Sequence, residues 1–522
     1  MTKVALDVAL ALALVAGYVA QMLRWLRVLQ REHYEPSSMH RFLGRWSSPP
    51  VGSARSSDSA KHRRPVTVSH VAVGALVLAL LSRRDVVVVV VSILYALTCP
   101  WGLSIKGRTS ALEWTRRLTT TAVVATVVAL LVVGLGLLGP RPWLGAAVVV
   151  WSVPLLLELS ARVLKPYENH QAQRFVVQAS ERLGRVAPQV VAITGSFGKT
   201  STKNHLNDLL AHDGGVVASP RSFNNRAGLS RAINENLRDD ARLFIAEMGT
   251  YGPGEIRAMC EWCTPDIAVV TAIGPVHLER MKTLEVIEKA KYEITERAST
   301  VVVNIDDERL ARWPDRLIDE GKRVRTAGSR NETASVRVVA GERWLVIVDG
   351  RPLAELAALE GVQPTNLACA LAAALETGLI DAHVAERVTR VGAIANRANV
   401  VTAASGVVVI DDTFNANPAS AASALDVLTR LELSGRRVVV TPGLIELGRD
   451  QYAENLQLGR RIDALGAELV VVGRTNAVAL QNGGELPGRR FDTRDEAVAW
   501  VRSALVRGDG VLYLNDLPDH YP

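Results

Sequence analysis

The stretch VAITGSFGKTSTK at residues 191–203 begins with an apolar run, passes through a turn with two glycines, and ends in a segment of lysine and hydroxyl residues. This order predicts a β-strand that leads through a glycine turn into an α-helix. Gly195 and Gly198 let the backbone N–H groups of the turn point inward, and the start of the helix adds its positive dipole end. Lys199 contributes a cation and Thr200 a hydroxyl group. The stretch therefore predicts a phosphate-binding loop at the end of a strand.

The spacing of this loop is unusual. Only Ser196 and Phe197 separate its glycines, whereas the common P-loop has four residues there. A glycine-rich turn with a fortuitous Lys-Thr pair is the alternative interpretation. The apolar run before the turn and the polar start of the helix favour the phosphate site. Thr200 would then offer its hydroxyl to a Mg²⁺ ion that accompanies the phosphate.

The composition places part of the chain in lipid. The protein has 522 residues, of which 48% are hydrophobic, and its long apolar runs are confined to residues 4–160. The formal net charge is +7, and the basic residues flank the apolar runs instead of forming a stripe interleaved with aromatic residues. This pattern favours membrane orientation over nucleic-acid binding. A chain of this length also predicts several domains.

The four cysteines, Cys99, Cys260, Cys263 and Cys369, are too scattered for a disulfide framework and suit a reducing compartment. Cys260 and Cys263 form a C-x-x-C pair, which could be half of a zinc site or a redox motif. No second pair follows in the sequence. We therefore expect both to be small buried residues.

Five apolar segments predict membrane-spanning helices. They occupy residues 4–23, 66–82, 86–104, 119–138 and 143–160. The first could be a signal peptide, but no small-residue cleavage site follows it and the next residues are rich in arginine. The connecting loops 24–65 and 105–117 are basic and are expected in the cytoplasm. This topology predicts a multi-pass plasma-membrane protein with its N-terminus outside and everything after Arg162 in the cytoplasm.

From Pro166 onward, short β-rich runs alternate with helical stretches, which predicts a mostly parallel α/β sheet. Glu247 follows one of these runs and His277 follows the next. Because the carboxyl ends of parallel strands meet at one edge of a sheet, both residues are expected beside Lys199 and Thr200. A carboxylate and an imidazole there could bind Mg²⁺, although each could also be an ordinary turn residue.

Several motifs follow one another in the order found in a known enzyme family. After the loop come NNRAG at 224–228, AEMGTYGPGEI at 246–256, TAIGPVHLE at 271–279, EKAKYEI at 288–294, GVQPTNLACALAAAL at 361–375, NRANVV at 396–401 and DDTFNANP at 411–418. This order resembles that of the ATP-dependent Mur ligases. Within that family it most resembles the branch that adds D-alanyl-D-alanine to a UDP-MurNAc-tripeptide. The short gap between the loop glycines is the form found in this family.

The resemblance implies a role for each matching residue. Lys199 would bind the ATP phosphates, Thr200 and Glu247 would hold one Mg²⁺, and His277 would hold a second. Lys291 resembles a lysine that is carbamylated in the family, and as a carbamate it would bind the second metal. The implied ATP-binding residues are Gly195, Ser196, Gly198, Lys199, Thr200, Ser201, Asn366, Arg397 and Asp412, and the implied catalytic residues are Lys199, Glu247, His277 and Lys291. Asn224, Asn225 and Asn415 are implied to contact substrate.

The resemblance also implies an architecture and a reaction. It implies an ATP-binding central domain at 166–395 with a mostly parallel sheet, and a smaller Rossmann-like domain at 396–522. At residues 1–165 the chain departs from the family, because the apolar segments predict a transmembrane helical region where the family has a domain that binds the UDP part of the substrate. In the reaction, ATP phosphorylates a carboxylate to an acyl phosphate, which an amine converts to an amide. The expected partners are ATP, Mg²⁺, a peptidoglycan precursor, an amino acid or dipeptide, and the lipid bilayer, but no nucleic acid.

Two alternatives remain open at this point. A ligase of the same type could use another acceptor, such as a lipid-linked precursor, or could form polyglutamate or carry out amidation. A membrane-anchored nucleotide-binding scaffold without catalysis would need only Lys199. The chain also carries Glu247, His277 and Lys291, which argues against a scaffold.

Overall fold

The computed structural model divides the chain into two compact units. The structure describes residues 3–32, 34, 39, 42–43, 71–81, 84–100, 103, 112–220, 223–359, 361–378, 381–392, 399–413, 416–485 and 488–515. The second unit, Gln171–Glu432 with Leu444–Glu454, contains every candidate site residue that is described. Two predicted site residues, Arg397 and Asn415, lie outside the described residues.

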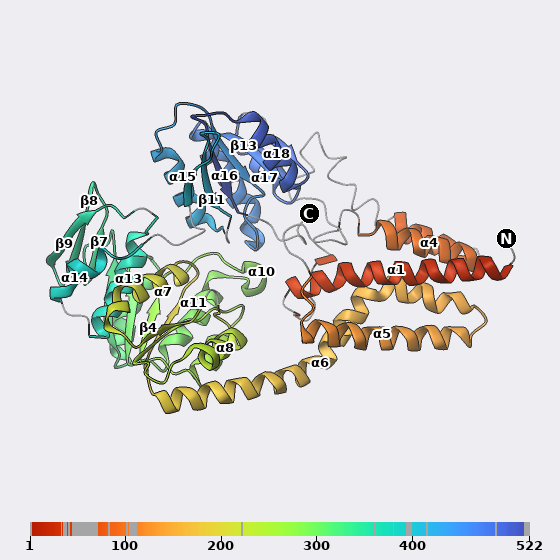
Figure 1. Ribbon diagram of the computed structural model, residues 1–522, viewed down its shortest axis with the longest axis horizontal. Coiled ribbons are helices and arrows are strands. Elements are labelled where there is room, and N and C mark those ends of the chain that lie inside the picture. Colours follow the sequence, from red (N-terminus) through yellow and green to blue (C-terminus); the bar gives the residue numbers. More distant parts are fainter. Residues whose placement is uncertain are drawn as a thin grey trace. The chain divides into compact units, whose positions relative to one another are not determined.

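The N-terminal part is helical. Its labelled helices are α1 (Lys3–Arg31), α4 (Asp85–Thr98), α5 (Arg116–Leu137) and α6 (Pro142–Val186), and a further helix covers Val71–Leu81. α1 packs beside α4 and α5 (Figure 1). Within the described residues, three helical segments are long and apolar enough to cross a membrane, namely Leu6–Arg31, Arg116–Leu137 and Trp143–Val186.

The other two predicted crossings form shorter apolar helices. α4 has 14 residues, so it is only about 21 Å long, whereas a hydrocarbon core is about 30 Å thick. The described part of the other, Val71–Leu81, is also shorter than a full crossing. By length, three described helices therefore qualify where the sequence predicted five.

Polar side chains of α1 bind the end of α4. α1 is longer than predicted, so Arg24 and Arg27, which the sequence placed in a loop, lie in the helix and are buried. Arg24 and Gln21 both donate to the carbonyl oxygens of Ala96 and Cys99. Carbonyl groups at the end of a helix lack partners within it, so the Gln21 amide and the terminal guanidinium nitrogens of Arg24 supply these carbonyls with donors.

A nine-stranded sheet carries the phosphate loop. Its order is β2-β3-β1-β4-β5-β6-β7-β8-β9. The strands from β2 to β7 pair in parallel, and β7, β8 and β9 pair antiparallel. The strands are β1 (Gln189–Thr194), β2 (Val216–Ala218), β3 (Leu243–Glu247), β4 (Ile267–Val270), β5 (Thr300–Asn304), β6 (Arg323–Gly328), β7 (Val336–Val339), β8 (Arg343–Val348) and β9 (Arg351–Ala357). The predicted mostly parallel sheet is confirmed.

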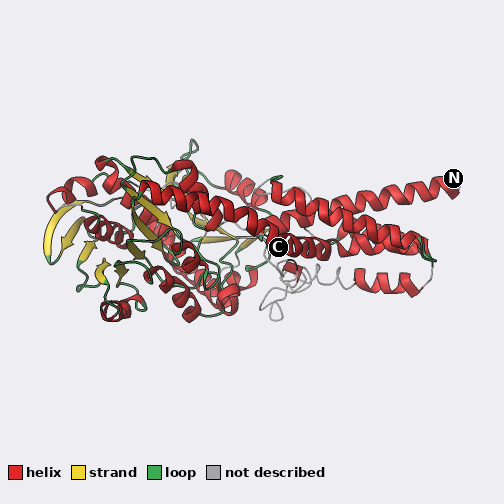
Figure 2. Ribbon diagram, turned by 90° about the horizontal axis from the view of Figure 1, so that it is seen from below, coloured by secondary structure: helices red, strands yellow, loops and turns green. Residues whose placement is uncertain are grey.

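Helices cover both faces of this sheet. Alternate residues of a strand point to opposite faces, and here both sets are apolar and buried. In β1, Val190 and Ala192 enter one apolar core, and Val191 and Ile193 enter the other. The helices of this region are α7 (Lys199–Leu210), α8 (Arg226–Asn236), α9 (Glu255–Cys260), α10 (Leu278–Met281), α11 (Leu284–Tyr292), α12 (Trp313–Asp319), α13 (Pro364–Glu376) and α14 (Asp381–Val388). Strands sandwiched between helices are visible in Figure 2.

A second sheet follows, with the order β10-β11-β15-β12-β13-β14. Its strands are β10 (Asn399–Thr402), β11 (Val408–Asp412), β12 (Arg437–Thr441), β13 (Glu468–Val472), β14 (Arg489–Phe491) and β15 (Gly510–Leu514). The helices α15 (Pro418–Arg430), α16 (Gln451–Ala464), α17 (Ala477–Gln481) and α18 (Arg494–Ala504) alternate with them. Strands β15, β12, β13 and β14 pair in parallel, and β10 and β11 pair antiparallel. This alternation is of the Rossmann type.

Candidate active site

The phosphate loop lies between the end of β1 and the start of α7. Gly195 has φ +152° and Gly198 has φ +80°, which are conformations that favour glycine. The Ser196 N–H donates to the Ala272 carbonyl at 2.7 Å, and the Ser196 hydroxyl donates to the Gly274 carbonyl at 3.1 Å. The loop is therefore held against the segment that follows β4, where the edge of a parallel sheet forms a binding crevice.

The loop has no room for larger residues. A Cβ atom on Gly195 would overlap the Thr271 side chain, and a Cβ atom on Gly198 would overlap the side-chain amide of Asn366. Both glycines are therefore required by their neighbours as well as by their backbone angles. Lys199 completes the loop, because its ammonium group turns back and donates to the Gly195 carbonyl at 2.6 Å.

Glu247 is the centre of the polar contacts beside this loop. It ends β3, and the register of the sheet pairs it with Ile193, next to the end of β1. The Thr200 hydroxyl lies 3.0 and 3.2 Å from its two carboxylate oxygens. The Asn224 amide donates to Oε1 at 3.1 Å, and the Lys203 ammonium lies 3.1 Å from Oε2. The structure thus brings Thr200 and Glu247 together, and Asn224 contacts the carboxylate.

Thr200 and Glu247 suit a hard cation. Mg²⁺ prefers oxygen ligands and commonly takes one or two from the protein, with phosphate and water oxygens completing the shell. A hydroxyl and a carboxylate within about 3 Å of each other, beside a phosphate loop, fit that requirement. This pair is the part of the described structure best suited to hold a nucleotide-bound Mg²⁺.

Lys203 is a further buried charge beside the loop, and the sequence pattern predicts no role for it. Its side chain is 2% exposed and that of Glu247 is 1% exposed. In the sequence, Lys203 is distinguished only by its position one helical turn after Lys199, on the same side of α7. Nothing in the sequence separates this residue from a solvent-exposed lysine, because its burial depends on how α7 packs.

Lys291 lies in the last turn of α11 and is 2% exposed. Burial, and secondarily the nearby charge of Lys199, lower its pKa well below the usual value, while Glu255, Glu247 and Glu293 act in the opposite direction. A lysine in such a site favours the neutral amine over the ammonium ion. The neutral amine is the form that reacts with carbon dioxide.

His277 makes a different set of contacts. It precedes α10 in a left-handed conformation, and its Nδ1 contacts the Glu446 carboxylate. Its ring lies 4.7 Å from that of Tyr251, and the Arg280 guanidinium lies 4.7 Å from the Tyr251 ring centre. Among the described residues, no three His, Cys, Asp or Glu side chains are grouped to hold a metal ion. A second metal site with His277 and Lys291 therefore remains a prediction.

Three other predicted site residues are described: Asn366 lies beside the loop, Asp412 lies at a strand end, and Asn225 caps a helix. Asn366 lies in the first turn of α13, beside the loop, and its carbonyl oxygen is 3.5 Å from the Thr202 hydroxyl. Asp412 ends β11 and is buried. Asn225 instead caps α8, because its side chain accepts from the Gly228 N–H at 2.9 Å. A capping role satisfies a free helix N–H group, so Asn225 has a structural task of its own.

The paired cysteines are structural. Cys260 and Cys263 are fully buried in the core beneath β3 and β4. Burial raises the pKa of Cys260 to about 12 and raises that of Cys263 further. A thiol with such a pKa is neither a good nucleophile nor a good metal ligand at neutral pH.

Comparison with known proteins places this site in a family. The Mur ligase middle domain matches residues 193–373, and the Mur ligase, glutamate ligase domain matches residues 396–514. The chain is 33% identical over 360 residues to the UDP-N-acetylmuramoyl-tripeptide--D-alanyl-D-alanine ligase of Mycobacterium tuberculosis (strain ATCC 25618 / H37Rv), with 62% of this chain and 69% of that protein covered. The chain belongs to the Mur ligase family. This confirms the resemblance drawn from the motifs.

Further Mur ligases support the assignment. The enzyme of the same name from Escherichia coli (strain K12) is 27% identical over 352 residues, covering 65% of this chain and 76% of the relative. The fold is similar to that of MurF from Acinetobacter baumannii, with a TM-score of 0.58, 23% identity, and coverage of 66% and 77%. It is also similar to the MurF ligase of Thermotoga maritima in complex with ADP, with a TM-score of 0.57, 24% identity, and coverage of 66% and 80%.

Proposed function

We propose that this Mur ligase is an ATP-dependent, ADP-forming ligase that joins an amino acid or dipeptide, with D-alanyl-D-alanine as first candidate, to the carboxylate of a peptidoglycan precursor. The observation that carries the proposal is the cluster of Lys199, Thr200 and Glu247 around the phosphate loop. It occurs in a chain 33% identical to ligases named for this reaction. A scaffold would not require the carboxylate.

The chain's residues would bind and orient the reactants. The loop N–H groups and Lys199 would neutralise the ATP phosphates while the acceptor carboxylate attacks the γ-phosphorus and ADP leaves. The amine would then attack the acyl phosphate, lose a proton, and expel inorganic phosphate. Asn366, Arg397 and Asp412 would contribute to ATP binding. Mg²⁺, held by Thr200 and Glu247, would stabilise the negative charge that develops on the phosphoryl oxygens.

Lys291 would act as a carbamate. Its neutral amine would add carbon dioxide and release a proton, which converts a buried basic group into an anion. An anion at that position would bind a second Mg²⁺ together with His277, whereas an ammonium ion would repel it. Support for this assignment comes from the burial of Lys291 and the direction of its pKa.

The membrane placement is part of the proposal. Three long apolar helices among the described residues, or the five crossings predicted from sequence, are both odd numbers. An odd number of crossings would put the N-terminus and the ligase domains on opposite sides of the membrane. With the ligase domains in the cytoplasm, where ATP is available, the N-terminus would lie outside. The basic residues that follow α1 and those that precede and begin α5 agree with this orientation.

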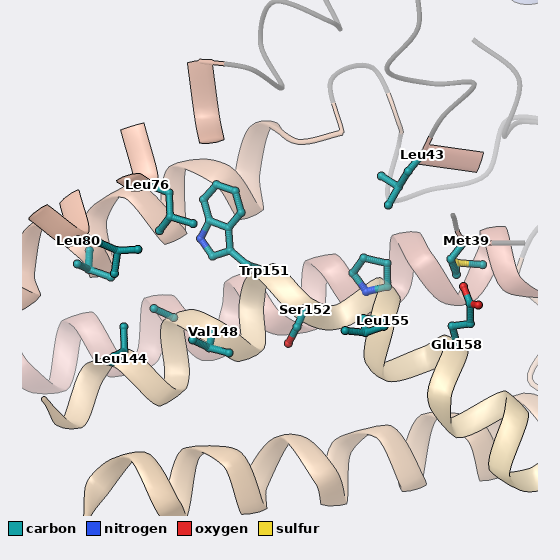
Figure 3. A pocket seen from close by; sticks show the side chains of 13 residues that line it. Met39, Leu43, Leu76, Leu80, Leu144, Val148, Trp151, Ser152, Leu155 and Glu158 are labelled. Atoms are coloured by element: carbon teal, nitrogen blue, oxygen red, sulfur yellow. The ribbon is translucent and has the colours of Figure 1, made fainter. Parts of the chain in front are cut away.

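A lipid-linked acceptor is the second candidate, favoured by a cavity in the helical region. The cavity has a volume of about 500 Å³. Leucine, valine and tryptophan side chains line it, with Leu144 at one end and Glu158 at the other (Figure 3). Glu158 pairs with Arg162 at 3.0 Å, and both residues belong to α6. An apolar cavity with a charged end suits a hydrocarbon chain that carries a polar head group.

The two candidates are separated by the acceptor that supports ADP release. The full chain in detergent or nanodiscs would be supplied with ATP, Mg²⁺, D-alanyl-D-alanine, and either a UDP-linked or a polyprenyl-linked tripeptide. A Val148→Trp change, which fills the cavity, is expected to raise KM only for the lipid-linked acceptor. Val127→Trp is the control, because Val127 is 51% exposed on α5 and does not line the cavity. ATP binding without turnover on any acceptor would favour the scaffold.

A further inference from the structure

Lys203 and Glu247 form an ion pair that is almost completely buried. Their side chains are 2% and 1% exposed, and Lys203 Nζ lies 3.1 Å from Glu247 Oε2. Lys203 is on α7 and Glu247 is at the end of β3, so the pair joins the helix behind the phosphate loop to the neighbouring strand. Removing one partner of such a pair leaves a buried charge without compensation, which is costly.

The contacts to Glu247 are distributed between its two oxygens. Lys203 binds Oε2 and Asn224 donates to Oε1 at 3.1 Å. The Thr200 hydroxyl is nearly equidistant from both oxygens, at 3.0 and 3.2 Å. Lys203 and Asn224 therefore fix the carboxylate from two sides, and its remaining face is directed to Thr200.

We infer that Lys203 is a positioning residue that, with Asn224, holds the Glu247 carboxylate in the orientation required to bind nucleotide-bound Mg²⁺. The inference rests on the proposed function in that it takes Thr200 and Glu247 as the ligands of that ion. Partners that orient a metal ligand change metal affinity by about 10- to 100-fold when they are removed.

A purely stabilising role explains the pair less well. α7 already packs against the sheet through apolar side chains. Leu206 and Leu209 are fully buried in the same core as Ile245 of β3. Replacing a buried ion pair with apolar residues is often neutral or stabilising, so stability alone does not call for charges here. Lys199, one turn earlier, binds the loop carbonyl of Gly195 and not the Glu247 carboxylate. The two lysines of α7 thus have different tasks.

The test measures how the binding of a fluorescent ATP analogue depends on Mg²⁺, using the full chain in detergent and no acceptor. Lys203→Met is expected to raise the Mg²⁺ concentration for half-maximal binding by about tenfold or more. Lys203→Gln, which keeps a hydrogen-bond donor, is expected to recover most of the Mg²⁺ affinity that Lys203→Met loses. Binding of the analogue in EDTA should be the same in all variants.

Two further variants keep the test decisive. Asn224→Ala removes the contact to the other oxygen without leaving a charge unpaired, and is expected to shift the Mg²⁺ dependence in the same direction even if Lys203→Met does not fold. Arg387→Met is the matched control. Arg387 is buried and pairs with Asp213 at 2.6 Å at the far end of α7, so its loss should lower Tm and leave the Mg²⁺ dependence unchanged.

The inference is overturned if Lys203→Met and Asn224→Ala lower Tm but leave the Mg²⁺ dependence as in wild type. It is also overturned if Lys203→Met and Lys203→Gln both bind Mg²⁺ more tightly, because the lysine would then act only by repelling the ion. Since the assay contains no acceptor, a failure to form an amide would count against the proposed function and not against this inference.

Discussion

The side-chain amide of Asn366 occupies the space that a Cβ atom on Gly198 would need. This places the start of α13 directly against the phosphate loop, in agreement with the close packing of α13 and α7 (Figure 1). The loop therefore cannot change its shape without moving Asn366. Nucleotide binding should depend on this fit.

Gly198→Ala should weaken ATP binding by about tenfold or more, because the new methyl group adds a steric conflict to a φ of +80°. Isothermal titration with ATP would measure the loss. Gly214→Ala is the control, since Gly214 also has a positive φ, +67°, but has no atom within 4 Å of a Cβ atom. Equal ATP affinity in the Gly198→Ala variant and wild type would show that the loop does not form the nucleotide site.

Lys291→Ala should reduce amide formation by about 100-fold, because it removes the carbamate expected to bind the second metal. Added formate or acetate should restore part of the activity by supplying a carboxylate in its place. In ¹³C-bicarbonate, wild type should give a carbamate NMR signal that Lys291→Ala lacks. Lys289→Ala, at an exposed position on the same helix, should keep both the activity and the signal; a signal that persists in Lys291→Ala would refute the assignment.

His205 should make the protein sensitive to mild acid. It is 1% exposed on α7, neither ring nitrogen has a hydrogen-bond partner among the described residues, and burial lowers its pKa from 6.5 to about 4. At pH 7.5 the ring is neutral in both the folded and the unfolded chain. As the pH falls below 6.5, the unfolded chain binds a proton that the folded chain does not, so the free energy of unfolding falls by about 2 kcal/mol at pH 5.

The measurement is Tm for wild type and His205→Leu between pH 7.5 and pH 5. The wild-type Tm should fall more steeply, and the variant should lose that part of the slope. His212→Gln, at an exposed position just after α7, should behave like wild type. An unchanged slope in His205→Leu would show that other groups control the acid sensitivity.

The sequence predicted the parts of the site that follow from local pattern and from sheet topology. The loop and its glycines were recognisable from spacing, and the meeting of Thr200 with Glu247 followed from the rule that parallel strand ends share one edge. The role of Lys203 could not be predicted, since it depends on burial. The contact between His277 and Glu446 joins residues 169 positions apart. No local pattern encodes such a pairing.

In the helical region, composition identified the apolar segments but not their lengths. Arg24 and Arg27 were assigned to a loop because their charge interrupts the apolar run, yet α1 continues through them. Both side chains are buried, and Arg24 binds carbonyl oxygens at the end of α4. Such contacts between distant segments are not visible in a hydropathy pattern.

We propose that ATP activates the acceptor carboxylate through an acyl phosphate at the Lys199 loop. An acceptor labelled with ¹⁸O in that carboxylate would be incubated with the full chain, ATP, Mg²⁺ and D-alanyl-D-alanine, with Lys199→Ala as the inactive control. We expect each amide bond formed to transfer one ¹⁸O atom from the carboxylate to inorganic phosphate, as detected by mass spectrometry. Amide formation with unlabelled phosphate, or ATP hydrolysis that is independent of the acceptor, would contradict it.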